Sequence, residues 1–290
     1  MRIGMVGLGK MGANMAERLR RAGHEVVGYD TRPGIGDVDR LDELLAALDG
    51  QPRRVVWVMV PAGGPTDATI TELAGLVAAG DLVVDGGNSD HRAAAGHART
   101  LAVSGASFLD VGVSGGVWGL EAGYSLMVGG DAADVADLQP VLDALGPPDG
   151  VAHVGPVGAG HFTKMVHNGV EYALMQAYGE GYELLRTSDL DVDVAAALQV
   201  WRHGSVVRSW LLDLLADAVS DDPELSQVRG YAEDSGEGRW TVRDAIDQAV
   251  PVPTIAAALF ARFASRQEES PAMQAVAVLR DRFGGHGVRS

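Results

Sequence analysis

The first half of the chain alternates between short apolar runs and longer segments with helical spacing. Residues 55–60 and 82–85 are short, apolar and β-branched, which is typical of strands buried on both faces of a sheet. Residues 66–79 lie between these runs and repeat their apolar positions with the period of a helix. Strands that alternate with helices predict βαβ units and a parallel sheet. We predict further strands at residues 2–6, 25–29, 107–113, 125–128 and 151–154, and a further helix at residues 11–22.

The pattern changes after about residue 156, where strand-like runs give way to helical ones. A stretch rich in Asp, Ser, Gly and Glu, residues 220–238, is typical of a loop between helices. We therefore expect two domains, residues 1–155 with the sheet and residues 156–290 with helices alone. The predicted helical segments of the second domain are residues 159–187, 192–219, 241–249, 253–265 and 271–283.

A glycine-rich turn, Gly7-x-Gly9-x-x-Gly12, follows the first predicted strand and opens the first predicted helix. Glycines alone can simply shape a turn, but a strand before, a helix after and an acidic residue about 20 positions later are the context of a dinucleotide-binding turn. The glycines allow a tight turn and close approach to a pyrophosphate, and the helix N-terminus offers free N–H groups to it. The predicted fold class is α/β, an N-terminal Rossmann doubly wound parallel sheet followed by an all-α domain.

Asp30 ends the second predicted strand, where a carboxylate can accept hydrogen bonds from the hydroxyls of the adenosine ribose. Its charge would repel a 2′-phosphate, so it favours NAD over NADP. Arg32 could swing toward such a phosphate, which leaves NADP possible. Besides the three glycines and Asp30, the candidate cofactor-binding residues are Leu8, Lys10, Met11, Thr31, Val60, Pro61, Ala62 and Asn88.

Three polar residues share one face of the first predicted helix of the second domain. Lys164, Asn168 and Glu171 stand at positions i, i+4 and i+7, with His167 beside them. Lys164 and Glu171 are then about 10 Å apart along the helix axis, which leaves room for a small, elongated polar ligand. The alternative is a solvated helix face with an ordinary Lys–Glu pair.

Three features favour a functional face. The chain contains one lysine besides Lys164, and a desolvated lysine, unlike an arginine, can lose its proton and act as a base. The neighbouring surface is apolar, which predicts burial over much of the helix circumference, and its residues are Ala159, Met165, Val166 and Val170. Gly160 and Gly169 are poor helix formers, and they predict the close approach of another group.

Five motifs are spread along nearly the whole chain. They are Asp85-Gly86-Gly87-Asn88-Ser89, Gly112-Val113-Ser114-Gly115-Gly116, Lys164-Met165-Val166-His167-Asn168-Gly169-Val170-Glu171-Tyr172, Asp234-Ser235-Gly236-Glu237-Gly238-Arg239-Trp240 and Phe283-Gly284-Gly285-His286. In sequence and in order they resemble the motifs of the decarboxylating 6-phosphogluconate dehydrogenase family. The chain length resembles the short branch of that family, in which NAD is the common cofactor.

The resemblance implies a reaction and roles for the matching residues. Lys164 would be the general base that takes the proton from the substrate's C3 hydroxyl as hydride leaves C3 for the nicotinamide, and it would return a proton to the 3-keto oxygen as CO2 departs. Glu171 would protonate C1 of the enediol, giving ribulose 5-phosphate. Asn88, Ser114, Gly115, Gly116, His167 and Asn168 would hold the sugar carboxylate and hydroxyls, and Tyr172 and Arg208 would bind the phosphate.

The resemblance also implies a partner subunit. Arg280 and His286 correspond to family residues that enter the active site from a second copy of the chain. We therefore expect a homodimer, or a tetramer built from dimers, in which C-terminal residues complete the partner's site. Arginine suits this role because its planar fork can bond two phosphate oxygens at once.

The chain departs from the long branch of the family at three places. Val117-Trp118-Gly119-Leu120 stands where an acidic pair is usual, Ser235 lies near the place of a phosphate-binding lysine, and Ser205-Val206-Val207 replaces Cys-Ile-Ile. These departures bear on phosphate affinity. They leave the Lys164–Glu171 pair intact.

Composition narrows the class of partner. The formal net charge of −16 argues against nucleic acid, because binding there depends on neutralising phosphates, and it requires local cations for any anionic substrate. The absence of cysteine excludes disulfides and thiol catalysis, and we predict no metal site. No apolar run reaches the roughly 18 residues of a membrane span, and the N-terminus starts in a strand pattern without a signal peptide. We expect a cytoplasmic protein.

Two other functions stay open from the residues. Another β-hydroxyacid dehydrogenase, such as a 3-hydroxyisobutyrate enzyme, shares the glycine turn and the helix lysine, but it lacks Glu171 and the Ser-Gly-Glu-Gly-Arg-Trp motif. A nonenzymatic NAD-binding sensor on the same fold belongs to a different class. A sensor needs neither an acid nor a base, whereas Lys164, Asn168 and Glu171 are all present.

Overall fold

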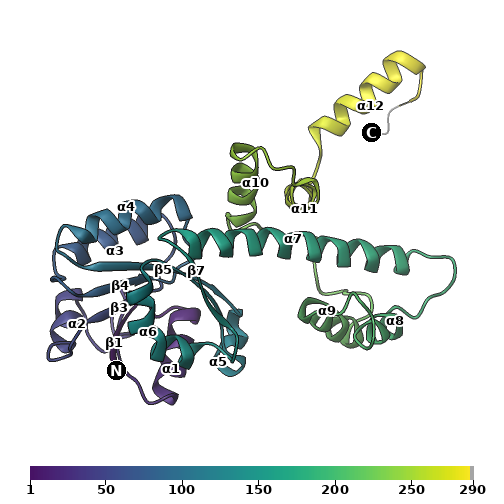
Figure 1. Cartoon of the computed structure of the whole chain (residues 1–290). Helices are drawn as coiled ribbons and strands as arrows, with labels where there is room; N and C mark the ends of the chain where they lie inside the picture. Colours follow the sequence, from purple (N-terminus) through teal and green to yellow (C-terminus); the bar gives the residue numbers. More distant parts are fainter. Residues whose placement is uncertain (288–290) are drawn as a thin grey trace. The chain divides into compact units, whose positions relative to one another are not determined.

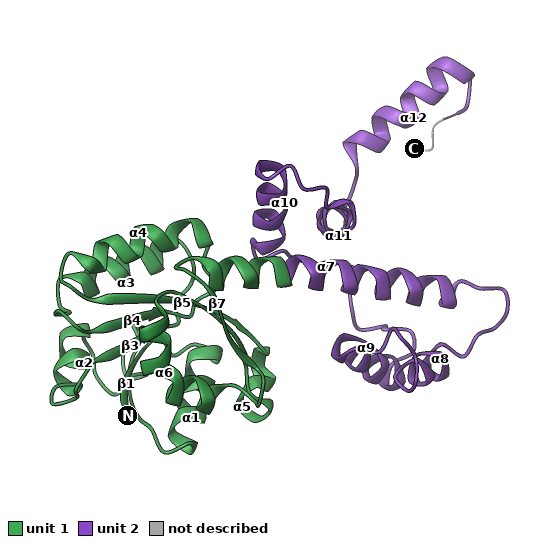
Figure 2. Ribbon diagram, viewed as in Figure 1, with its two compact units in different colours: residues 1–167 green, residues 168–290 purple. Residues whose placement is uncertain are grey.

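A seven-stranded sheet forms the centre of the first of two units in the computed structural model, which describes residues 1–287. The units are Met1–His167 and Asn168–Ser290 (Figures 1 and 2). The strand order is β2-β1-β3-β4-β5-β6-β7. The strands are β1 (Arg2–Val6), β2 (Glu25–Tyr29), β3 (Val55–Val58), β4 (Leu82–Asp85), β5 (Ser107–Ser114), β6 (Ser125–Gly129) and β7 (Val151–Gly155).

The predicted strands are confirmed, with ends that differ by up to two residues. One pairing corrects the expectation of a parallel sheet, because β5 and β6 are antiparallel, with Asp110 opposite Gly129 and Ser114 opposite Ser125. The connection between them contains only the short helices η1 (Gly116–Trp118) and α5 (Gly119–Ala122). A return to a parallel neighbour needs a crossover of a dozen or more residues, so the chain turns back on itself here instead.

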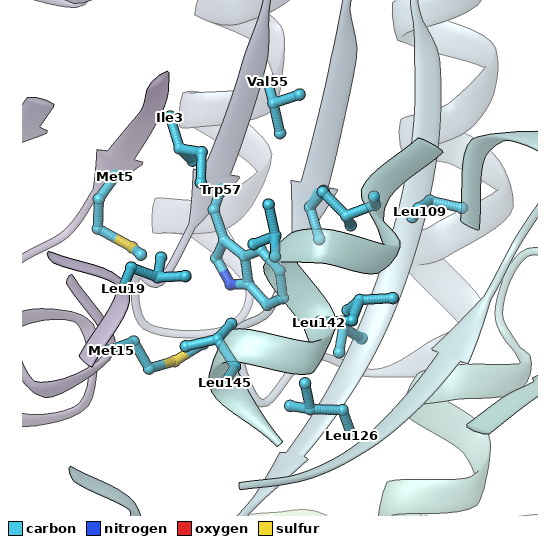
Figure 3. Packing of buried hydrophobic residues seen from close by; sticks show 14 of the residues in the cluster. Ile3, Met5, Met15, Leu19, Val55, Trp57, Leu109, Leu126, Leu142 and Leu145 are labelled. Atoms are coloured by element: carbon cyan, nitrogen blue, oxygen red, sulfur yellow. The ribbon is translucent and has the colours of Figure 1, made fainter. Parts of the chain in front are cut away.

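Helices cover both faces of the sheet, as in a doubly wound fold (Figure 1). α1 (Lys10–Arg21) and α6 (Ala132–Leu145) pack on one face, where Ile3, Met5 and the fully buried Trp57 point (Figure 3). α2 (Leu41–Ala47), α3 (Gly64–Ala74) and α4 (His91–Ala102) pack on the other face, against Val6 and its neighbours. Successive strand residues therefore enter opposite cores, which explains why these strands are apolar at nearly every position.

Helices α2, α4 and α6 were not predicted from the pattern. α4 is built largely from alanine with polar residues, which makes its apolar stripe weak. α6 has an apolar stripe at helical spacing, but it also contains Pro140, which disfavours a helix interior. Both begin at an aspartate whose carboxylate accepts a backbone hydrogen bond from the first turn, Asp90 from Arg92 and Asp131 from Ala133. α3 also ends at Ala74, five residues before the predicted end.

Helices are the only regular secondary structure in the part of the second unit that the structure describes. Its small cores centre on Leu198 and Leu212, and on Tyr172 with Leu259. No helix among residues 1–287 combines the length and apolar character needed to cross a bilayer. The helices are α7 (Ala159–Arg186), which begins in the first unit, α8 (Val194–Trp201), α9 (Trp210–Asp221), α10 (Glu237–Asp247), α11 (Pro253–Ala264) and α12 (Pro271–Gly284).

The segment 192–219, predicted as one helical run, is two helices with a break between them. Gly204 in the break has a φ of +73°, a conformation that ends a helix. The Tyr178 hydroxyl donates to the Val207 carbonyl oxygen at 2.8 Å, and Ser209 caps α9 by accepting from the N–H of Leu212. Apolar residues on both sides of the break keep helical spacing, so periodicity alone does not reveal it.

Candidate active site

The carboxyl ends of the first four strands bring together the predicted cofactor-binding residues. The chain leaves β1 for one neighbour, β2, and later returns to the other neighbour, β3, so the order reverses at β1 and β3. Ligands of open α/β sheets bind in the crevice outside such a switch point. The segments that follow the four strands are 7–12, 30–31, 60–62 and 86–88, and each contains predicted cofactor-binding residues.

The glycine turn has the shape that the sequence predicts. Gly7 has a φ of +92°, and a Cβ there would lie 2.6 Å from the Met59 carbonyl oxygen. A Cβ on Gly12 would overlap the Gly7 carbonyl oxygen, so α1 packs against the turn more closely than a side chain permits. Gly9 is the N-cap of α1, has open space around it and provides no side-chain cap. The N–H groups of the first turn therefore face a place that a pyrophosphate fits.

Asp30 lies beside this turn with its side chain nearly buried. Its carboxylate accepts a hydrogen bond from the N–H of Leu8 at 2.8 Å. It also forms a bidentate ion pair with Arg32, with N–O distances of 2.8 and 3.0 Å. The Arg32 guanidinium, aided by backbone N–H groups, holds the pKa of Asp30 well below its usual range. Arg32 also donates to the Leu8 carbonyl oxygen, so it covers the carboxylate assigned to the ribose.

Strand β5 runs alongside the start of α7. A Cβ on Gly112 would overlap the Cβ of Lys164, so glycine is needed where the lysine stem crosses the strand. Two residues further on, the Ser114 hydroxyl oxygen lies 3.4 Å from Nε2 of His167. The structure therefore brings the lysine and two predicted substrate-binding residues to one end of β5.

Helix α7 continues without a break past Lys164, Asn168 and Glu171. Its predicted glycine approaches are confirmed, because a Cβ on Gly160 would overlap the Asp110 carbonyl oxygen and one on Gly169 would lie 2.7 Å from Thr241. The expected burial over much of its circumference is confirmed for residues 159–172, where every residue is buried or half-buried except Val166 and Val170, which are 37% and 47% exposed.

The surroundings of Tyr172 differ from those expected for a phosphate site. Its ring is buried, its hydroxyl oxygen accepts the N–H of Ser235 at 3.3 Å, and the guanidinium of Arg262 lies 3.5 Å above the ring. Arg262 was missed by sequence reasoning, since an arginine near the end of a predicted helix carries no signal of its own. Arg208 lies exposed between α8 and α9, and Arg280 and His286 are exposed at the C-terminal end.

Three buried polar residues of the first unit were also missed as a group. Asp85 ends β4, Asp110 lies in β5, and His161 lies in the first turn of α7. Nε2 of His161 lies 3.2 Å from a carboxylate oxygen of Asp85. Only Asp85 belongs to a motif quoted above, and the contact joins residues far apart in the sequence.

Two family models match the chain one after the other. The NAD binding domain of 6-phosphogluconate dehydrogenase matches residues 2–155, and the C-terminal domain of 6-phosphogluconate dehydrogenase matches residues 160–284. A relative from Haloferax volcanii, named NAD(+)-dependent, decarboxylating 6-phosphogluconate dehydrogenase, is 42% identical, and the match covers 99% of this chain and 98% of that protein. The Bacillus subtilis protein of the same name is 36% identical, over 94% of this chain and 64% of its own.

Solved structures share the fold. A Plasmodium falciparum 6-phosphogluconate dehydrogenase superposes with a TM-score of 0.80 at 24% identity, over 100% of this chain and 66% of its own. A Mycobacterium tuberculosis 3-hydroxyisobutyrate dehydrogenase gives a TM-score of 0.74 at 24% identity, over 96% and 99%. At such low identity, both likenesses bear on the fold alone.

Proposed function

The chain belongs to the 6-phosphogluconate dehydrogenase family, and we propose that it converts 6-phospho-D-gluconate to D-ribulose 5-phosphate and CO2 with reduction of NAD. The observation that carries this proposal is α7, an unbroken helix with Lys164, Asn168 and Glu171 on one face. We assign the cofactor to residues 1–155 and the substrate and dimer contacts to residues 156–290. NADP is the second candidate cofactor.

Lys164 and Glu171 divide the proton transfers between them. Bound NAD supplies the acceptor for the hydride that leaves C3. Neutral Lys164 takes the proton of the C3 hydroxyl as that hydride leaves, and the resulting ammonium group protonates the 3-keto oxygen as the C1–C2 bond breaks and CO2 departs. Glu171 then protonates C1 of the enediol. The seven-residue separation, about 10 Å along the axis, suits a base and an acid that act on different carbons.

Other side chains would hold the sugar acid and its phosphate. Asn88, exposed at the end of β4, and the Ser114–His167 contact support binding of hydroxyls and carboxylate, together with Gly115, Gly116 and Asn168. Tyr172 and Arg208 would bind the phosphate, with Arg280 and His286 from the partner. Because the net charge is −16, these arginines must supply the positive potential that the chain as a whole lacks.

The proposed activity is tested by steady-state assay with NAD or NADP and with 6-phosphogluconate or gluconate. We expect NADH and CO2 in equal amounts from the phosphorylated acid, and a lower kcat/KM for gluconate. Bound NAD without turnover of either acid would instead indicate a sensor. Turnover of 3-hydroxyisobutyrate alone would place the activity in a different dehydrogenase class.

We expect Asp30→Ala to raise the ratio of kcat/KM for NADP to that for NAD by about tenfold, the effect of one or two hydrogen bonds and a removed like charge. The variant frees Arg32 from its ion pair, so the guanidinium can meet a 2′-phosphate. The double variant Asp30→Ala/Arg32→Ala is the control and should lose most of that gain. An unchanged ratio in both variants would remove Asp30 from cofactor selection.

The C-terminal helix supports a homodimer, and a tetramer of dimers is the larger alternative. α12 has no buried residue, and its exposed apolar side chains include Met273, Leu279 and Phe283, at 62%, 66% and 97%. Exposed apolar groups gathered on one helix mark an interaction site, and Arg280 lies on the same helix. The proposed occupant is a second copy of the chain, whose active site Arg280 and His286 would complete.

We expect Leu279→Glu to convert the dimer to a monomer in sedimentation, whereas Val103→Glu, at the exposed C-terminal end of α4, should leave the mass unchanged. Mixed dimers test the shared site. Lys164→Arg and Arg280→Ala subunits, each inactive alone, should regain about a quarter of wild-type activity after random exchange, because half of the dimers are mixed and each has one intact site. No regained activity would exclude a site completed by the partner.

A further inference from the structure

Strand β5 contacts the start of α7 through alternate residues. The Asp110 carboxylate accepts the N–H of Gly158 at 2.6 Å and that of His161 at 2.8 Å. Two residues along the strand, Gly112 lies against Gly160 and the Lys164 stem, and two residues further Ser114 lies against His167. Residues i, i+2 and i+4 of a strand face one side, so one face of β5 meets successive turns of α7 in register.

Asp110 is the cap of the first turn of α7. A helix N-terminus leaves N–H groups without partners inside the helix, and its own N-cap side chain usually accepts one of them. Gly158, which precedes α7, has no side chain. The capping side chain therefore belongs to β5, a strand inside the sheet. Its two hydrogen bonds fix the position of the first turn of α7 along the helix axis relative to β5.

The Asp85–His161 ion pair fixes the same turn from β4. Burial disfavours the charge on each partner, but the opposing charge outweighs it, so the pKa of Asp85 is lowered and that of His161 is raised. Asp110 from β5 and Asp90 from the start of α4 are the other charged groups that favour a positive His161. The N–H of Gly87 donates to Asp85 and holds the carboxylate in place.

A buried ion pair stabilises the contact between a helix and a sheet only weakly. Hydrophobic residues of similar volume are often as stable or more so, because burying two charges costs free energy that their attraction barely returns. What a directional pair provides is a defined orientation. His161 lies one turn before Lys164, so the ring that contacts Asp85 and the lysine rotate together about the helix axis.

We propose that Asp85, His161 and Asp110 are positioning residues for Lys164. They set the rotation of the first two turns of α7 about the helix axis and their position along it, so that the lysine reaches the C3 hydroxyl. This inference rests on the proposed function in its assignment of Lys164 as the base. It extends the site to three residues that would touch neither cofactor nor substrate.

The test uses His161→Gln in the full-length enzyme. We expect kcat to fall about 10- to 100-fold, the penalty of a base displaced by about an ångström, while the Kd of NAD stays unchanged. The variant also removes the cation beside Asp85, while the glutamine amide and the N–H of Gly87 can still donate to the carboxylate and favour its ionised form. An anion without a cationic partner at this turn of α7 favours the charged lysine. The pKa of Lys164 should therefore rise, moving the acidic limb of the kcat/KM profile to higher pH by about half a unit or more.

A second measurement does not depend on turnover. The chain contains only Lys10 and Lys164, so protein labelled with [ε-13C]lysine gives two side-chain signals, which Lys10→Arg assigns. Their titration reports the pKa of Lys164 directly. If the wild type does not turn over 6-phosphogluconate, the proposed function fails. The positioning inference is then still decided by whether His161→Gln moves the Lys164 signal.

Two further variants make the result specific. Asp85→Asn removes the ion pair with little change in net charge, because burial then favours the neutral imidazole, and it should lower kcat with a smaller shift of the Lys164 pKa. His97→Gln is the matched control, since His97 is also buried and its ring contacts Asp67 of α3 at 2.8 Å. It should change stability alone. Unchanged kcat and Lys164 pKa in both His161→Gln and Asp85→Asn would overturn the inference.

Discussion

Lys164→Arg is expected to lower kcat by about 10²- to 10⁴-fold, the usual contribution of a positioned base, while NAD binds with unchanged affinity. Arginine keeps a positive charge at the end of a long, flexible side chain, but it does not give up its proton in a protein. The substitution therefore separates a base from a group that merely attracts an anionic substrate. The measurement is kcat with 6-phosphogluconate beside the Kd of NAD by calorimetry.

Lys164→Met completes that comparison. It removes both charge and proton transfer, so the two variants should be about equally slow if the lysine acts as the base. If Arg restored near-normal turnover and Met did not, the role of Lys164 would be electrostatic and the proton would need another acceptor.

Gly12→Ala is expected to abolish NAD binding and to lower the free energy of unfolding by about 1–3 kcal/mol or more, the cost of overpacking. Its Cβ would overlap the Gly7 carbonyl oxygen, and α1 could make room only by moving away from the turn. That movement would displace the N–H groups that face the pyrophosphate. Thermal unfolding with and without NAD measures both effects.

Gly9→Ala is the control for that prediction. Gly9 has an ordinary φ of −66°, and no atom lies within 4 Å of the place that a Cβ would take, so the fold should tolerate alanine there. Only NAD affinity should fall, because the methyl group would point into the space assigned to the phosphates. Equal loss of stability in both variants would contradict the close-packing account of Gly12.

The sequence predicted what periodicity and short motifs encode. The buried strands and the glycine turn could be predicted from local sequence, because a short apolar run bounded by turn residues is typical of a buried strand. The antiparallel β6 did not follow, because strand direction depends on how the chain returns, and the connection after Ser114 contains two short helices without a periodic signal. The break at Gly204 was hidden for the opposite reason, as the periodicity continues through it.

The candidate site divides in the same way. Lys164 and Glu171 could be paired from spacing on a helix, and the spacing is kept in α7. The residues proposed to position Lys164 could not be predicted, because Asp85 and Asp110 contact α7 from two neighbouring strands that are far from it in the sequence. The stacking of Arg262 on Tyr172 likewise joins two helices. Contacts of this kind depend on tertiary structure that no single segment specifies.

The ion pair between Arg32 and Asp30 means that, in the free protein, the carboxylate proposed to bind the ribose already has a cationic partner. In this proposal NAD displaces the guanidinium from Asp30, so the measured affinity of NAD includes the free energy of breaking that ion pair. Arg32 is 59% exposed, and dissolved salt screens exposed ion pairs. Added salt should therefore weaken the Asp30–Arg32 ion pair, which favours NAD binding. It should also weaken the contacts to the pyrophosphate, which disfavours binding. Because the two effects partly cancel, we expect the affinity for NAD to vary little with ionic strength.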